Sequence, residues 1–423
     1  MLNRIISALG ALSVSDYLLN EVREESAELF FIRKKLDMRR RKDVTKYEVT
    51  VYRDFEENGR AMRGQSSALI SADADEASVR RSLESAWNAA ASVKNPAFRL
   101  YEGQKAEPVQ MPSGFAAWTL AQSTEKMTDA LFAADTRTDA FLNSAELFLS
   151  RKTVRILSSA GTDVGYVKYH CAGEFIAQCR TPQDVEQYFA FSYGEPDCGA
   201  LTKKVADALD TVCDRAKAKQ SPKGGTYDLI LAGDDLAELL GFYGQRAAAQ
   251  MVYAHYSDYR PGTQVQGENV HGEKLDLTLL PSAPYSEEGI PMPERKLIAD
   301  GTLQFIHGPT RFCRYLGTEP TGLYRRMKLD NGTVPFDTLK QGCLYPVSFS
   351  AFDMDGMSGR FGGEIRLAYL FTENGVEILT GGSVNGSLLE KQDDLTFSTE
   401  RYTSEVYTGP LAVKLKGISV SGE

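Results

Sequence analysis

Residues 145 to 180 have the sequence AELFLSRKTVRILSSAGTDVGYVKYHCAGEFIAQCR. Apolar and polar residues alternate along both arms of this stretch, and the turn-forming segment SSAGTDVG separates the arms. Alternation with a period of two places the apolar side chains on one face of a strand. The stretch therefore predicts two strands of an antiparallel meander that is buried on one face only.

The segments around this meander show further periodic patterns. Upstream, the pattern predicts an amphipathic first helix, two strands near residues 29–32 and 47–51, and a helix over residues 76–93 that Ser71, Asp73 or Asp75 caps. Downstream, it predicts a helix over about residues 123–138, opened by Ser123 or Thr124, and a helix over about residues 199–217. The first hundred residues thus read as strand, strand and helix after the initial helix.

The second half of the chain opens with YDLILAG, which predicts a buried strand. Asp234 or Asp235 is expected to cap the next helix, which contains AELLGFYGQRAAAQMV, residues 237–252. Strand-like segments dominate after it. Because helices and strands are segregated, we expect an α+β fold and not a doubly wound sheet.

The polar stretch KAKQSPKGGTYD is the best candidate for a domain boundary. We expect an N-terminal mixed α/β region over residues 1–222, with 1–100 and 101–222 as subregions. A strand-rich domain over residues 223–423 follows, with one prominent helix after its first strand.

Charge excludes some partners. The chain has 48 basic and 57 acidic residues among 423, a net charge of −9, which argues against bulk attraction to nucleic acid or an anionic membrane. One basic cluster, Arg39, Arg40, Arg41 and Lys42, falls in the predicted connection between the first two strands. It favours either a solvated loop tip or, in an alternative hypothesis, a peptide-binding or nucleic-acid-associated module.

Common catalytic and compartment signals are mostly missing from the sequence. It contains no phosphate-binding G-x-x-x-x-G-K-[ST] loop, no G-x-G-x-x-G motif and no C-x-x-C pair. The six scattered cysteines predict reduced thiols, and no apolar run reaches the roughly 20 residues of a membrane span, so we expect a cytoplasmic protein. An independent hydrolase would need a metal site assembled from distant residues such as His255, His271 and Glu273.

Residues 285–326 carry the most specific signal: YSEEGIPMPERKLIADGTLQFIHGPTRFCRYLGTEPTGLYRR. This segment resembles the hallmark of the TldD/PmbA family, once named modulators of DNA gyrase and regarded as metallopeptidase subunits. The matching residues are Glu287, Glu288, Gly289, Ile290, Pro291, Gly301, Leu303, Leu316, Gly317, Thr321, Gly322, Arg325 and Arg326. The resemblance continues through the glycine-rich residues 358–390 and the terminal residues 410–423. It implies the family's two-domain α+β fold.

The TldD branch of this family carries H-E-x-x-x-H on the helix after the first C-terminal strand, where two histidines bind zinc and the glutamate serves as general base. In this chain, the three positions hold Gln245, Arg246 and Gln250. A cysteine is also expected within residues 393–410, and none is present there. Gln is a weak zinc ligand and Arg cannot accept a proton, so these residues predict no zinc site and no catalytic residue in this chain.

The resemblance therefore implies a zinc-free subunit of the PmbA branch, also called TldE. Such a subunit pairs with a TldD-like metallopeptidase subunit that holds the zinc, and the pair cuts unfolded or extended peptides. Glu288, Arg325 and Arg326 are the peptide-binding candidates, because paired arginines suit a carboxylate; a solvated arginine pair is the alternative. A homodimer of the isolated chain is left open, and we expect no membrane or nucleic-acid partner.

Overall fold

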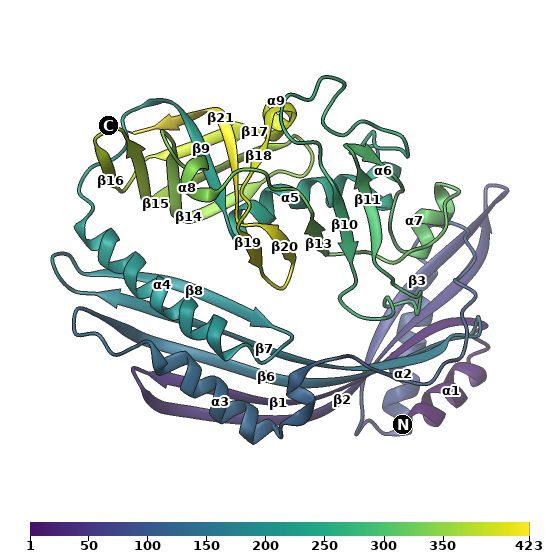
Figure 1. Cartoon of the computed structure of the whole chain (residues 1–423). Helices are drawn as coiled ribbons and strands as arrows, with labels where there is room; N and C mark the ends of the chain where they lie inside the picture. Colours follow the sequence, from purple (N-terminus) through teal and green to yellow (C-terminus); the bar gives the residue numbers. More distant parts are fainter. Residues whose placement is uncertain (423) are drawn as a thin grey trace.

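The structure is a computed structural model, and it describes residues 1–422. It contains three β-sheets with helices packed on them (Figure 1). An eight-stranded sheet belongs to the N-terminal half of the chain, and a six-stranded and a seven-stranded sheet belong to the C-terminal half. The predicted α+β class is confirmed, as is the strand-rich second half with a prominent helix directly after its first strand.

The N-terminal elements are α1 (Leu2–Ala11), β1 (Asp16–Ile32), β2 (Lys35–Glu57), β3 (Arg60–Ser71), α2 (Glu76–Ala90), β4 (Asn95–Pro96), β5 (Val109–Gln110), η1 (Gly114–Ala117), α3 (Leu120–Ala133), β6 (Ala140–Ser158), β7 (Asp163–Cys179), β8 (Val185–Tyr193) and α4 (Cys198–Lys217). The sheet order is β4-β3-β2-β1-β6-β7-β5, with β8 paired to β7. The predicted meander is β6 and β7, which pair antiparallel along almost their whole length.

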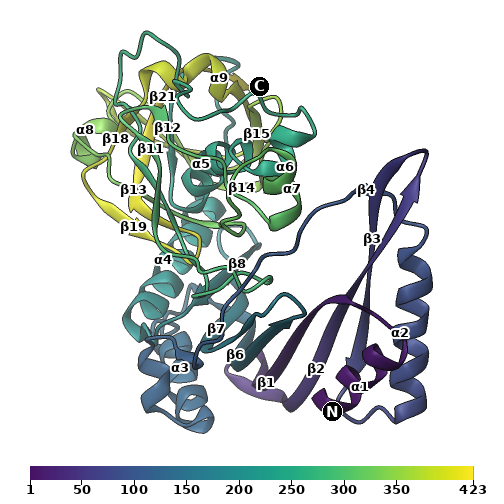
Figure 2. The same cartoon turned by 90° about the vertical axis from the view of Figure 1, so that its right-hand side faces the viewer.

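The two faces of this sheet have different partners. On β1, Leu19 packs with α1 and α2 at one end, and Leu29 packs with α3 and α4 at the other. Both side chains lie on the same pleat face, because they are an even number of residues apart. The opposite face carries Leu18 and meets Tyr285 and Tyr315 of the C-terminal half. Figures 1 and 2 show the C-terminal half above the sheet, with α1 and α2 at one end and α3 at the other.

The C-terminal elements are β9 (Gly225–Ala232), α5 (Asp234–Arg246), α6 (Ala249–Tyr253), β10 (Leu277–Leu280), β11 (Arg295–Ala299), β12 (Thr302–Leu303), α7 (Thr310–Tyr315), β13 (Arg326–Leu329), α8 (Phe336–Leu339), β14 (Leu344–Met354), β15 (Arg360–Thr372), β16 (Gly375–Leu379), β17 (Ser383–Ser387), α9 (Leu388–Lys391), η2 (Gln392–Asp394), β18 (Thr396–Phe397), β19 (Arg401–Thr403), β20 (Tyr407–Pro410) and β21 (Ala412–Ser421). One sheet has the order β12-β11-β10-β13-β20-β19. The other closes on itself, because β14 pairs with both β9 and β15.

The predicted boundary between residues 222 and 223 falls in the segment between α4 and β9. The division into two domains stays a prediction. Within residues 1–422, no helix is both long and apolar enough to cross a membrane.

Several local predictions were wrong. The pattern missed β3. The basic cluster of residues 39–42 lies within β2 and not in the connection before it, and Arg40 and Lys42 are paired with Glu28 of β1. Cross-strand pairing to Glu28 thus offsets the charge of two of the four cations.

Helix starts were also misplaced. Helix α3 begins three residues before Ser123, because Thr119 and Gln122 form a reciprocal capping box. Helix α5 follows Gly233, whose φ of 62° makes the turn, while Asp234 and Asp235 lie in the first helical turn. Asp75 does cap α2, by accepting from the Ser78 N–H at 2.7 Å.

Candidate functional site

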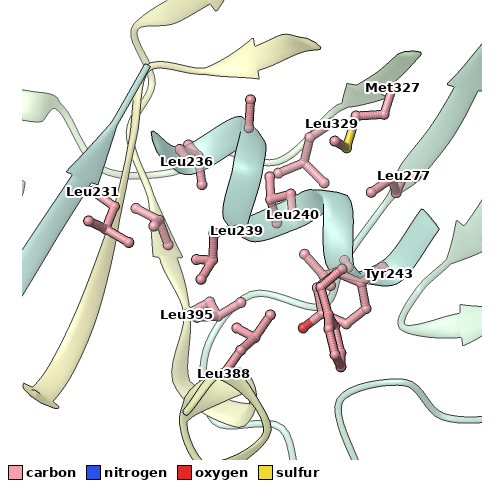
Figure 3. Close-up of a cluster of buried hydrophobic side chains, with 14 of the residues drawn as sticks. Leu231, Leu236, Leu239, Leu240, Tyr243, Leu277, Met327, Leu329, Leu388 and Leu395 are labelled. Atoms are coloured by element: carbon pink, nitrogen blue, oxygen red, sulfur yellow. The ribbon is translucent and has the colours of Figure 1, made fainter. Parts of the chain in front are cut away.

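Helix α5 is held between the two C-terminal sheets by its apolar side chains. Leu236, Leu239, Leu240 and Tyr243 recur at helical spacing and are fully buried. Figure 3 shows Leu240 directed toward Leu277 and Leu329 on one side, and Leu239 toward Leu395 on the other. Burial on both sides fixes the position of α5 between the sheets, and therefore the position of Gln245 and Arg246 at its end.

The predicted continuous helix over residues 237–252 is broken. Helix α5 ends at Arg246, Ala248 is extended with φ −74° and ψ 132°, and α6 starts at Ala249. The backbone of His307, which is distant in sequence, stabilises this break. The Ala249 N–H donates to the His307 carbonyl at 2.7 Å, and the His307 N–H donates to the Ala247 carbonyl at 3.1 Å. Three consecutive alanines favour a helix, so tertiary hydrogen bonds override local propensity here.

The break decides which side chains can meet. In a continuous helix, residues five apart point in directions about 140° apart. Here, both Gln245 and Gln250 line one cavity, whose volume is 470 Å³. The family resemblance aligns these two residues with metal-ligand positions, and only the break brings them to one cavity.

Two arginines reach the same cavity from the start of β13. Arg325 and Arg326 line it together with Leu323, Met327 and the His307 ring. No Asp or Glu side chain is among its lining residues, so the cavity has an excess of positive charge. Such a space favours an anionic group over a metal cation.

The two arginines have different roles. Arg326 donates from Nε to the Glu405 carbonyl at 2.7 Å and from Nη1 to the Pro281 carbonyl at 3.1 Å, so it ties β13 to two neighbouring segments. Arg325 is exposed and forms no ion pair within residues 1–422. Of the predicted pair, Arg325 is therefore the one available to a ligand.

The side chain of Arg246 does not line this cavity. Its guanidinium donates to the Met357 carbonyl at 3.1 Å, is paired with Asp258 and packs against the rings of Phe242 and Tyr259. The side chain is only 11% exposed. At the position where the resemblance expects a general base, the chain carries a buried structural cation.

Glu288 lies near the site but serves another element. Its Oε2 accepts from the Thr310 N–H at 2.8 Å and from the Thr310 hydroxyl at 2.9 Å, which caps the start of α7. Burial raises the pKa of Glu288, the Thr310 hydrogen bonds oppose that rise, and the neighbouring Glu287 adds to it. Glu288 also lines a second cavity of 260 Å³, which includes Arg325 and, from the N-terminal sheet, Lys168. Arg325 thus links two cavities.

His307 was not singled out by its sequence, although it organises the site. It is 1% exposed, its Nε2 donates to the Gly244 carbonyl at 2.9 Å, and its Nδ1 accepts from the Tyr324 N–H at 3.3 Å. Burial lowers the pKa of His307 to about 4, so the ring is neutral at neutral pH. Because both ring nitrogens are engaged, His307 fits a structural role and not a metal-ligand role. No local pattern in the segment FIHGPT, residues 305–310, marks His307 as a buried residue of this site.

The donor set around the cavity does not fit zinc. Two amide side chains, two guanidinium groups and a fully bonded imidazole supply no thiolate, carboxylate or free imidazole. Throughout residues 1–422, no group of three or more His, Cys, Asp or Glu side chains is placed to hold a metal ion.

The alternative site from His255, His271 and Glu273 does not assemble. The Glu273 carboxylate accepts from the Gly332 N–H, the Thr333 hydroxyl and the Phe397 N–H, each at 2.9 Å. These bonds tie three segments together. Glu273 is therefore a structural carboxylate.

Comparisons with known proteins agree with this architecture. Residues 224–422 match the family model described as the PmbA/TldA metallopeptidase C-terminal domain. Among curated protein sequences, none matches the chain.

Three solved structures are similar over the full length. A candidate modulator of a DNA gyrase from Thermotoga maritima has 16% identity and a TM-score of 0.76, with 99% of each chain covered. TldE from Thermococcus kodakarensis has 14% identity and a TM-score of 0.75, with 100% of each chain covered. A candidate modulator of DNA gyrase from Bacteroides thetaiotaomicron has 16% identity and a TM-score of 0.74, with coverage of 100% of this chain and 99% of the other. Residues 224–422 are therefore similar to the C-terminal domain of PmbA/TldA metallopeptidases, and the whole length of the chain has the fold of these solved structures.

Proposed function

We propose that this chain is the zinc-free, TldE-like subunit of a two-component metallopeptidase that acts on unfolded or flexible peptides. In this role it supplies part of the peptide groove and an assembly surface, while a TldD-like partner supplies zinc and the general base. The observation that carries the proposal is the 470 Å³ cavity lined by Gln245 and Gln250. The resemblance to the TldD branch aligns these two residues with the metal ligands of the H-E-x-x-x-H motif. The fold shared with TldE supports the same assignment.

The cavity favours a peptide carboxylate as its ligand. Arg325 lines it without a carboxylate partner, and no acidic side chain lines the wall. A guanidinium can bind a carboxylate through two parallel hydrogen bonds. We infer that Arg325 contacts a peptide terminus or an acidic side chain, while Arg326 and Glu288 position the surrounding backbone.

The test compares the purified chain, a TldD-like protein from the same cell, and an equimolar mixture. We expect no stoichiometric zinc and no peptide hydrolysis from this chain alone, and hydrolysis of an unfolded reporter peptide by the mixture above that of the partner alone. Elemental analysis measures the zinc content, and a fluorogenic peptide assay measures the hydrolysis. Tight zinc binding together with hydrolysis by this chain alone would refute the proposal.

A second experiment tests Arg325. In the mixture, Arg325→Gln should raise KM for a peptide with a free C-terminal carboxylate by about tenfold, as expected for one lost charge-assisted contact. Arg314→Gln is the matched control, since Arg314 is also exposed but does not line the cavity. Equal effects of the two variants would exclude Arg325 as the carboxylate contact.

A further inference from the structure

A separate cavity lies on the face of the N-terminal sheet that is turned away from the C-terminal half. It has a volume of 290 Å³ and is lined by η1, the first turn of α3, and strands β1, β2, β6 and β7. Phe115, Trp118, Leu120 and Leu149 make much of its wall apolar. A concave space that combines an apolar wall with convergent polar groups is typical of small-molecule sites.

The cations at this cavity outnumber the carboxylates. Arg41 and Arg151 line it, and Glu25 is the one acidic lining residue. Glu25 is already paired with Arg151 at 3.0 Å, and Asp43 on the neighbouring strand is paired with Arg23 at 2.9 Å. Arg41 is exposed and forms no ion pair with any residue in 1–422. One guanidinium is therefore available to an anionic ligand.

The start of α3 adds further donors. Its N-cap, Thr119, lines the cavity, and the first N–H groups of a helix have no carbonyl partner within the helix. The capping box uses the Gln122 N–H, which leaves the Leu120 and Ala121 N–H groups as donors. Ser123 is 3% exposed and also lines the cavity, and its hydroxyl has no hydrogen-bond partner in the described chain. The sequence suggested that Ser123 opens the helix. Because the helix starts at Leu120, this hydroxyl is left in the cavity wall.

We propose that this cavity binds a small organic anion with an apolar or aromatic body. Arg41 and the first turn of α3 hold its carboxylate or phosphate, since guanidinium groups and helix N-termini both bind such oxygens. The Ser123 hydroxyl donates one further hydrogen bond, and the body of the ligand packs against Trp118 and Leu149. This site is independent of the peptide cavity, because it lies on the opposite face of the sheet.

Tryptophan fluorescence gives a local readout. The chain has two tryptophans, and Trp87 lies on α2 and packs against the cluster that α1 and α2 share, so Trp87→Phe leaves Trp118 as the single tryptophan. Phenylacetate, phenyl phosphate and the neutral phenylacetamide are titrated against this full-length variant. We expect at least one anion to give a saturable change and to bind at least about tenfold more tightly than the amide, as a charge-assisted contact requires. The tighter anion identifies carboxylate or phosphate as the preferred group.

Two matched variants locate the site. Arg41→Gln should weaken anion binding by at least about tenfold, and Ser123→Ala by a smaller factor of about threefold. Arg39→Gln is the control, because Arg39 is exposed on the same strand and the same pleat face without lining the cavity. No saturable response to either anion, equal binding of the amide, or equal losses in the Arg39 and Arg41 variants would each overturn the proposal.

Discussion

The hairpin of β6 and β7 and the helical segment of α5 and α6 were predicted from the same kind of pattern, with different outcomes. In the hairpin, the alternating residues Leu147, Leu149, Phe175 and Ala177 are buried together on one face, as predicted. The prediction that only one face is buried was wrong, because Val154, Ile156 and Val164 are buried on the opposite face beside the C-terminal half. In the helical segment, periodicity is correct as far as Ala247, which is fully buried, and the helix then breaks at Ala248. A pattern predicts burial well when the core contacts it directly, and poorly when a distant backbone competes for its hydrogen bonds.

The largest change in stability is expected in the β6–β7 hairpin, where alternation predicted the core residues. Phe175→Ala should lower the free energy of unfolding by about 3–5 kcal/mol, since the ring is 1% exposed and packs between Phe189 and Phe191. Urea denaturation measures the change. Glu174→Ala, on the opposite face of the same strand, should cost less than about 1 kcal/mol. Comparable losses in both variants would show that alternation does not set the core.

The second prediction concerns the break between α5 and α6, where helical periodicity fails. It tests how the stability of the protein depends on the protonation of His307. The pKa of His307 falls to about 4 in the folded protein from 6.5 in the unfolded chain, so protonation favours unfolding between these values. The contribution of His307 is complete above pH 6.5 and is lost as the pH falls toward 4. It amounts to about 3 kcal/mol.

His307→Gln removes this titration. The difference in unfolding free energy between the wild-type chain and the variant should therefore narrow from pH 7 to pH 4, as measured by denaturation at a series of pH values. His271→Gln is the control, because His271 is exposed. A difference that stays constant with pH would show that His307 is not held neutral at the break.

Arg326 should have a smaller effect. Arg326→Gln removes hydrogen bonds to the Glu405 and Pro281 carbonyls and should cost about 1–2 kcal/mol of unfolding free energy. Thermal unfolding is a sufficient measurement. An unchanged melting temperature would show that the Arg326 hydrogen bonds do not stabilise the fold.

Arg325 should have the smallest effect on stability. Arg325→Gln should change the unfolding free energy by less than about 0.5 kcal/mol, because its side chain is exposed and unpaired within the described chain. The same denaturation assay, run beside Arg326→Gln, separates the two neighbours. A loss as large as that of Arg326→Gln would argue against a ligand-binding role for Arg325.

Parts of the fold and of the site were accessible from the sequence. Alternation in residues 145–180 and helical spacing in α4 and α5 predicted elements whose cores the structure confirms, because side-chain periodicity and burial are directly linked. The resemblance carried by residues 285–326 led to the family that residues 224–422 match. It also selected Gln245, Gln250 and Arg325, which the structure brings to one cavity.

The tertiary structure decided what these residues can do. The break at Ala248 depends on hydrogen bonds to His307, which lies far away in sequence, and local propensity favours the opposite outcome. The different roles of Arg325 and Arg326 depend on which carbonyl groups come within reach, and no pattern within T-G-x-x-R-R encodes that. The sequence by itself determined the face of each periodic element that packs in its local core, because burial follows from periodicity. The second buried face of the N-terminal sheet depends on the C-terminal half. Only the folded chain determined which polar groups are satisfied, because their partners are brought together by contacts between segments far apart in sequence.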